Sequence, residues 1–252
     1  TNITFTVDAN REVGSTKQFH QLLGGVGYDF DPPESLDQPL KVAGIKYIRL
    51  INVDYVDTKM ITNPDGSSYV TAGRLDKQLD WCTKVGALPH IIIGQRIPPW
   101  LSSRGNDVMV GPKDWQSYTK FLHLFMKYVI VTRGFRQATW EVGNEADIGS
   151  GPVPQVPRGP VGGESDYQAY FNIYRHIATV ATELEKELGI KIKLGGPAAA
   201  AIERYRSGSF NWYIRFLQDV SREGLKCDFY SLHYYGNFSA IGRRENPPNQ
   251  FP

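Results

Sequence analysis

An asparagine and a glutamate stand next to each other at Asn144 and Glu145, directly after a short segment that favours a strand. That segment is Ala138–Val142, in which Glu141 lies between apolar residues. A carboxyl group can give and take a proton, and the adjacent amide can hydrogen-bond a hydroxyl group of a ligand. The alternative is a plain polar turn, with Asn144 as a turn residue and Glu145 solvated. The surrounding elements must decide between a site and a turn.

Length and charge limit the class of protein. A chain of 252 residues is long enough for one α/β barrel or two small domains. A net charge of +2 is too small to indicate a nucleic acid or an anionic membrane as partner. No apolar run approaches the roughly 18 residues of a membrane-spanning helix. Cys82 and Cys227 have no metal-ligand spacing, and two buried free thiols are favoured over a disulfide.

Strand-like and helix-like segments alternate along the chain. The expected strands are Leu22–Phe30, Tyr47–Val53, Leu88–Gly94, Ala138–Val142, Lys191–Gly195 and Asp228–Tyr235. The expected helices are Ser35–Ala43, Arg74–Val85, Pro112–Thr132, Ser165–Leu188 and Phe210–Glu223. This alternation predicts a parallel sheet with helical crossovers, and the apolar strands fit a sheet that is buried on both faces. A doubly wound sheet is the alternative, but the sequence has no convincing phosphate-binding fingerprint.

Two further segments stand apart from this alternation. Ile3, Phe5 and Val7 alternate with polar residues, which predicts a half-buried strand outside the main sheet. Asp65 and Gly66 lie between two strand-like segments within Thr58–Gly73, which predicts an inserted hairpin.

Polar side chains recur in or after the predicted strands. They are Arg49, His90, Asn144, Glu145, His233 and Tyr235. If the strands form a barrel, their carboxyl ends converge on one face, and these side chains would line a hydrogen-bonding pocket there. Taken singly, His90 could be a core histidine and Arg49 a barrel ion-pair residue. The spacing of the five histidines does not favour a metal site, and no G-x-S-x-G motif favours a serine hydrolase.

Several tracts resemble the clan A retaining glycoside hydrolases, which are built on (β/α)8 barrels, and within them family 39, the β-xylosidase and α-L-iduronidase group. WEVGNEA, at residues 140–146, is similar to the fourth-strand signature of that family, although Gly143 and Ala146 stand where the family usually has Trp and Pro. The other similar tracts are YFNIY at Tyr170–Tyr174 in the fourth helix, LGGPA at Leu194–Ala198 in the fifth strand and DFYSLHYY at Asp228–Tyr235 in the sixth. The match runs in order through most of residues 22–236.

The resemblance implies an O-glycosidase that needs no cofactor and acts with retention on an oligosaccharide or glycoside. Glu145 would protonate the leaving oxygen and then activate water, while Asn144 would bond the sugar 2-hydroxyl. The other implied roles are orientation of the nucleophile by Arg49 and Tyr235, shaping of the sugar subsite by His233, and substrate binding by His90.

Retaining hydrolysis needs a second carboxylate about 5–5.5 Å from the first, and in the clan it is a Glu at the end of the seventh strand. After Tyr235 the sequence has one carboxylate, Glu245, within a segment that favours a loop or a helix start. We therefore expect the nucleophile from outside this chain, which would be half of a cleaved protein or a piece of a longer one. The alternative function is a non-catalytic carbohydrate-binding barrel without the nucleophile.

The predicted organisation follows from this comparison. Residues 1–20 would be an N-terminal strand and lead-in, in an accessory β-domain, and residues 21–252 the first six of eight βα units of a TIM barrel. The chain starts at Thr1 without a signal-like segment, and Asn2 and Asn237 match the N-glycosylation pattern. These features predict a secreted or lumenal glycoprotein.

Overall fold

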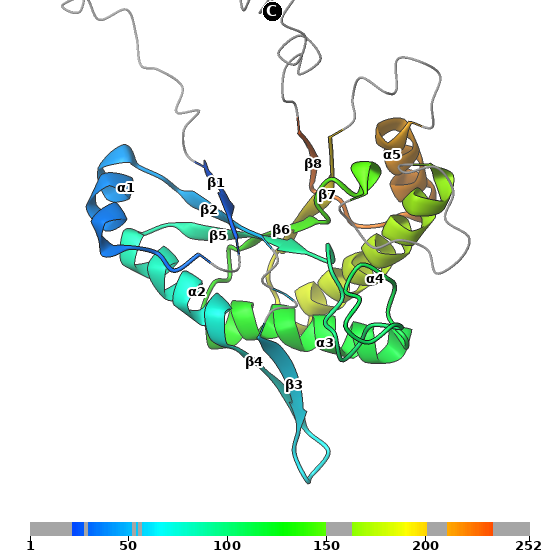
Figure 1. Ribbon diagram of the computed structural model, residues 1–252, viewed down its shortest axis with the longest axis horizontal. Coiled ribbons are helices and arrows are strands. Elements are labelled where there is room, and N and C mark those ends of the chain that lie inside the picture. Colours follow the sequence, from blue (N-terminus) through cyan, green and yellow to red (C-terminus); the bar gives the residue numbers. More distant parts are fainter. Residues whose placement is uncertain are drawn as a thin grey trace, which may run out of the picture.

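The computed structural model describes residues 22–27, 30–51, 54, 57–149, 163–200 and 211–233. Its main sheet has six strands in the order β1-β2-β5-β6-β7-β8, and every neighbouring pair is parallel. The strands are β1 (Leu22–Val26), β2 (Tyr47–Leu50), β5 (Leu88–Ile93), β6 (Thr139–Val142), β7 (Lys193–Ala199) and β8 (Phe229–Leu232). Figure 1 shows this sheet curled like part of a barrel. The predicted α/β class and the partial (β/α)8 barrel are confirmed.

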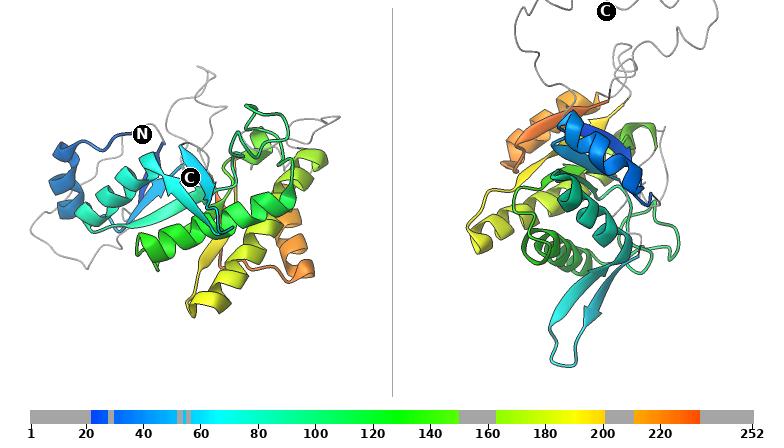
Figure 2. Two further views of the ribbon diagram at one scale, coloured as in Figure 1. Left: turned by 90° about the horizontal axis from the view of Figure 1, so that it is seen from below. Right: turned by 90° about the vertical axis from the view of Figure 1, so that its left-hand side faces the viewer.

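Helices connect the successive strands and lie along one face of the sheet (Figures 1 and 2). The α-helices are α1 (Asp37–Ala43), α2 (Gly73–Val85), α3 (Trp115–Lys127), α4 (Glu164–Leu188) and α5 (Trp212–Glu223). Short 3-10 turns lie at Glu34–Leu36 and Ala146–Ile148, and a π-helical turn, Tyr128–Thr132, extends α3. The predicted helices are therefore confirmed, with small shifts at their ends.

Caps account for these shifts. The predicted helix from Pro112 starts instead at Trp115, because the Asp114 side chain accepts hydrogen bonds from the backbone N–H groups of Gln116 and Ser117. The predicted helix from Phe210 starts at Trp212, where the Asn211 side chain caps the N–H of Ile214. Such caps satisfy backbone donors that have no partner inside the helix.

Several strand boundaries differ from the predictions. β1 and β2 end before their predicted ends, at Val26 and Leu50. β7 instead runs past the predicted end at Gly195 as far as Ala199, although it contains Pro197. Proline cannot donate a hydrogen bond to a sheet, so a strand would be expected to end before it. The pairing of β7 with β8 accommodates it through an irregular register between Pro197 and Ala199. Because β7 is longer than predicted, its carboxyl end lies beside Glu145, the residue that follows β6.

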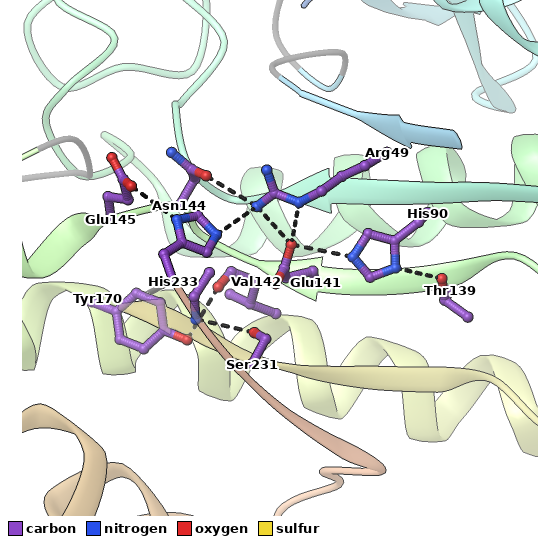
Figure 3. A network of polar contacts seen from close by, with 11 residues as sticks. Arg49, His90, Thr139, Glu141, Val142, Asn144, Glu145, Tyr170, Ser231 and His233 are labelled. Carbon is purple, nitrogen blue, oxygen red and sulfur yellow. Dashed lines mark hydrogen bonds and ion pairs between the residues drawn. The ribbon is translucent and has the colours of Figure 1, made fainter. Parts of the chain in front are cut away.

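Side chains of alternate residues point to opposite faces of the sheet, and the two faces differ in chemistry. Ile91, Trp140 and Leu194 belong to the core cluster shared with the helices. Their neighbours in sequence, His90 and Glu141, point to the other, concave face (Figure 3). The apolar core therefore lies between sheet and helices, and the polar groups lie inside the curl of the sheet.

The predicted hairpin is confirmed as an antiparallel pair, β3 (Thr58–Thr62) and β4 (Ser68–Ala72). Val70 and Ala72 are buried in the core, and the hairpin tip projects beyond α2 and α3 (Figure 1). Both cysteines are free, as predicted. Cys82 is buried, but Cys227 is only half-buried.

Within the described part of the chain, none of the helices has the length and apolar character needed to cross a lipid bilayer. The predicted strand Ile3–Val7 and the division at residue 20 lie outside the described residues and stay predictions.

Candidate active site

The carboxyl end of β6 holds the candidate acid in an unusual backbone conformation. Glu145 has a φ of 52°, in the left-handed region, and its N–H donates to the Ala198 carbonyl oxygen at 2.9 Å. This conformation costs a non-glycine residue about 1–2 kcal/mol. Strained residues of this kind cluster at functional sites when the surrounding structure holds them in place. The bond to the end of β7 supplies such a hold, so the backbone favours a site here over a simple turn.

Gly143, which stands where the resembled family usually has Trp, fits the local backbone and packing of this chain. It has a φ of 75°, and a Cβ atom at this position would lie 2.8 Å from the Tyr170 ring of α4. The Tyr170 hydroxyl donates to the Val142 carbonyl oxygen at 3.2 Å. The tyrosine ring thus fills the space into which a side chain at position 143 would extend, and Gly143 fits both the conformation and the packing.

The side chain of Glu145 is held by His233, which directly follows β8. His233 Nδ1 lies 2.9 Å from Glu145 Oε1, and the two side chains are 19% and 16% exposed. The backbone N–H of His233 donates to the Ala199 carbonyl oxygen at 2.8 Å, which fixes the histidine beside the end of β7. The carboxyl group is therefore partly buried and oriented, yet still reachable from solvent.

Arg49 of β2 contacts both His233 and the side-chain amide of Asn144. Its Nη2 lies 3.0 Å from Asn144 Oδ1 and 3.3 Å from His233 Nε2 (Figure 3). These residues come from three strand-ends that are up to 184 positions apart in sequence. The structure thus brings together four of the predicted site residues: Arg49, Asn144, Glu145 and His233.

Glu141 is a member of the cluster that the sequence analysis did not include. Its Oε2 lies 2.8 Å from Arg49 Nε, 2.7 Å from Arg49 Nη2 and 3.2 Å from His90 Nε2. His90 Nδ1 in turn contacts the Thr139 hydroxyl at 2.7 Å. The signal in the sequence is one charged residue inside an otherwise apolar strand, since such a charge needs a buried partner.

The Glu141 side chain is 4% exposed, and its carboxyl group stays ionised. Burial alone would raise its pKa, but the His90 hydrogen bond and the Arg49 charge outweigh burial and lower the pKa to about 2. The buried pair thus places a permanent anion beneath the Asn144–Glu145 pair.

This pKa gives a prediction for stability. Because the folded value of about 2 lies below the ordinary 4.5, the stabilisation by Glu141 is present above pH 4.5 and is lost as the pH falls through 2. The difference in free energy of unfolding between wild type and Glu141→Gln should shrink by on the order of 3 kcal/mol across this window. Denaturant unfolding at several pH values measures it, and a difference that does not vary with pH would contradict the assignment.

A second buried carboxyl group lies after β2. Asp54 accepts a hydrogen bond from the Gly94 backbone N–H at 2.7 Å, and burial raises its pKa to about 7. Within the described ranges, no group of three or more His, Cys, Asp or Glu side chains could hold a metal ion.

Three predicted residues lie outside the described part of the chain. They are Tyr235 and the two glycosylation candidates, Asn2 and Asn237. Their roles stay predictions, as do the roles assigned to the described site residues.

The sheet order and the helical crossovers define a part of a (β/α)8 barrel, and a cluster of polar side chains lies at the carboxyl ends of its strands. A scan against models of protein families finds no match, and neither does a search of curated proteins. A GH39 β-xylosidase from Caulobacter crescentus is similar in structure, with 22% identity and a TM-score of 0.62 over 92% of this chain and 50% of that one. A GH39 enzyme from Xanthomonas axonopodis pv. citri matches with 19% identity and a TM-score of 0.61 over 88% of this chain and 42% of that one.

These likenesses show that the chain has the fold of the GH39 enzymes, as the sequence resemblance predicted. The chain spans about half the length of the solved structures that it matches.

Proposed function

We propose that this chain carries the acid/base half of a retaining glycosidase, which hydrolyses O-glycosidic bonds in an oligosaccharide or glycoside. The observation that carries this proposal is the Glu145 carboxyl group, held by His233 beside Asn144 at the carboxyl end of β6. In barrel enzymes, catalytic side chains lie at these strand ends. Glu145 would protonate the leaving oxygen as a general acid and then activate water as a base.

The contacts of Glu145 and Asn144 suit these two roles. His233 Nδ1 lies 2.9 Å from Glu145 Oε1 and orients the carboxyl group that would carry the proton toward a leaving oxygen. Arg49 donates to Asn144 Oδ1, which turns the amide N–H groups to the other side, where they can donate to a sugar hydroxyl. An ordered donor and an ordered acid beside each other support a site for a hydroxylated ring.

The nucleophile must be a second carboxylate about 5–5.5 Å from the acid. Glu141 is a poor candidate, because its side chain is 4% exposed and is engaged by Arg49 and His90. We propose instead that a strand beyond β8 supplies the nucleophile from polypeptide outside this chain, either covalently continuous or separate. Arg49 and Tyr235 would orient that carboxylate.

Apolar surface at the β8 edge supports this completion of the barrel. Ile214 and Leu217 on α5 are 55% and 50% exposed, and Leu232 on β8 is 47% exposed. A further βα unit would pair with β8 and cover these side chains, as in a closed barrel. Open sheet edges with apolar surface favour aggregation, so their covering would also keep the protein soluble.

Secretion and glycosylation at Asn2 and Asn237 belong to the same proposal. They rest on the two sequence triplets, Asn2-Ile-Thr4 and Asn237-Phe-Ser239, which match the N-glycosylation pattern.

Covalent labelling tests the function directly. The full-length protein that contains this chain would be incubated with a panel of activated 2-deoxy-2-fluoro glycosides, which trap the glycosyl-enzyme of a retaining enzyme. We expect one sugar adduct per active site, on a carboxylate outside residues 1–252, and a first-formed product with retained anomeric configuration by NMR. Absence of turnover with intact sugar binding would favour the carbohydrate-binding alternative. An adduct on Glu141 would overturn the assignment of the nucleophile.

A further inference from the structure

Glu141 lies one layer below the Asn144–Glu145 pair. Glu141 points into the curl of the sheet between Arg49 of β2 and His90 of β5, and Figure 3 shows its carboxylate between the two side chains. The other titratable or charged groups that face the cluster are Glu145 and His233 above it and Tyr170 of α4 behind β6. Among these described groups, Arg49 is the permanent cation and Glu141 its partner.

The hydrogens of Arg49 decide what its neighbours can do. Its Nε donates to Glu141 Oε2, and its Nη2, which also lies 2.7 Å from that oxygen, donates to Asn144 Oδ1 and contacts His233 Nε2. Arginine has donors and no acceptor, so the atom of His233 that it meets must be an unprotonated nitrogen. The remaining proton of a neutral His233 is then on Nδ1, and it donates to Glu145 Oε1 at 2.9 Å.

The same logic fixes the amide. Because only an oxygen can accept from Arg49 Nη2, Asn144 must present Oδ1 to the arginine and its N–H groups to the opposite side. One guanidinium thus sets both the tautomer of the histidine and the orientation of the amide. Its own place depends on two contacts to a single oxygen, Glu141 Oε2, at 2.8 and 2.7 Å.

We propose that Glu141 is a positioning residue of the acid/base site: its carboxylate fixes Arg49, which then sets the His233 tautomer and the Asn144 amide. The catalytic consequence rests on the proposed glycosidase function, whereas the tautomer does not. Both nitrogens of His90 are occupied, by Glu141 and Thr139, so His90 supports this anion from below.

Two variants of the full-length protein separate the effect of the charge at position 141 from the effect of the side-chain length. Glu141→Gln keeps the size and removes the charge, so the Arg49 cation is uncompensated and favours ionised Glu145. We expect kcat/KM to fall about 100-fold, and the alkaline limb of its pH profile to move down by about one unit. Glu141→Asp keeps the charge, but its shorter side chain no longer contacts Arg49 in the same way. We therefore expect kcat/KM to fall while the alkaline limb of its pH profile stays in place.

Asp219→Asn is the matched control. Asp219 is also a buried carboxylate paired with arginine, Arg215, but it lies on α5 away from the strand ends. This variant should lower Tm and leave the pH profile of the folded enzyme unchanged. If Glu141→Gln behaves in the same way, Glu141 is merely structural and the proposal is wrong.

A readout without turnover distinguishes this inference from the proposed function. The ¹⁵N chemical shifts of His233 in the wild-type protein should show the Nδ1–H tautomer, and Glu141→Gln should give a mixture of tautomers. An Nε2–H tautomer in the wild type overturns the inference even if the enzyme is active. An inactive wild type with the expected tautomers overturns the glycosidase proposal alone.

Discussion

Glu145→Ala is expected to lower turnover of glycosides with poor leaving groups by about 10²- to 10⁴-fold, the usual contribution of a general acid. The reason is that an alkoxide leaving group departs only if a proton reaches its oxygen, and in the proposed function Glu145, held by His233, supplies that proton. Initial rates for a series of aryl and alkyl glycosides would measure the effect. The loss should grow steadily as the pKa of the leaving group rises.

Azide supplies the second half of this test. On a substrate with a good leaving group, the variant should still form the glycosyl-enzyme but hydrolyse it slowly, because no base activates water. Azide needs no deprotonation, so it should restore turnover and give a glycosyl azide with retained configuration. This outcome requires the nucleophile to be present, so the experiment uses the full-length protein.

Glu183→Ala provides the control, since Glu183 is an exposed glutamate of α4. It should have wild-type rates with every leaving group. A Glu145→Ala variant whose rate falls equally for good and poor leaving groups, with no azide product, would contradict the acid/base role. Its loss would then reflect a general disturbance of the site.

Gly195→Ala is expected to destabilise the fold by about 3 kcal/mol or more, at or beyond the upper end of the usual cost of overpacking. A Cβ atom at Gly195 would lie 2.2 Å from the Phe229 carbonyl oxygen and 2.5 Å from its ring. These atoms belong to the neighbouring strand, because Gly195 and Phe229 are paired in register. Relief of the clash requires β8 to move away from β7, which also displaces His233 from Glu145.

Gly24→Ala is the matched control for this substitution. Gly24 also lies in a strand with an ordinary φ, but a Cβ atom there would have no neighbour within 4 Å. Its free energy of unfolding should stay within about 0.5 kcal/mol of the wild type. Denaturant unfolding compares the two variants, and equal stabilities would show that the β7–β8 contact is not as close as described.

The sequence predicted the order of elements because that order depends on local patterns. Apolar repeats of three and four residues indicate α2 and α3. Gly86 and Gly189 mark the ends of α2 and α4, where both glycines adopt the left-handed conformation. The position of Asn144 and Glu145 after a strand also follows from local residue types. The fold and the face on which a site would lie were therefore predictable.

The role of Glu141 was not predictable in the same way. A charge in an apolar strand indicates that a partner exists, but Arg49 is 92 positions away and His90 is 51 positions away. Only the register of β2, β5 and β6 brings these side chains together on the concave face. The same register decides that Gly195 meets Phe229.

The sequence by itself determined the alternation of strands and helices, and the strand ends at which Arg49, Asn144, Glu145 and His233 lie, because hydrophobic period and caps act over a few residues. The tertiary structure decided the left-handed backbone of Glu145, the buried anion of Glu141 and the hydrogen-bond directions around Arg49. These depend on contacts between strands far apart in sequence, where burial and hydrogen bonding fix one arrangement among many that the local chain allows.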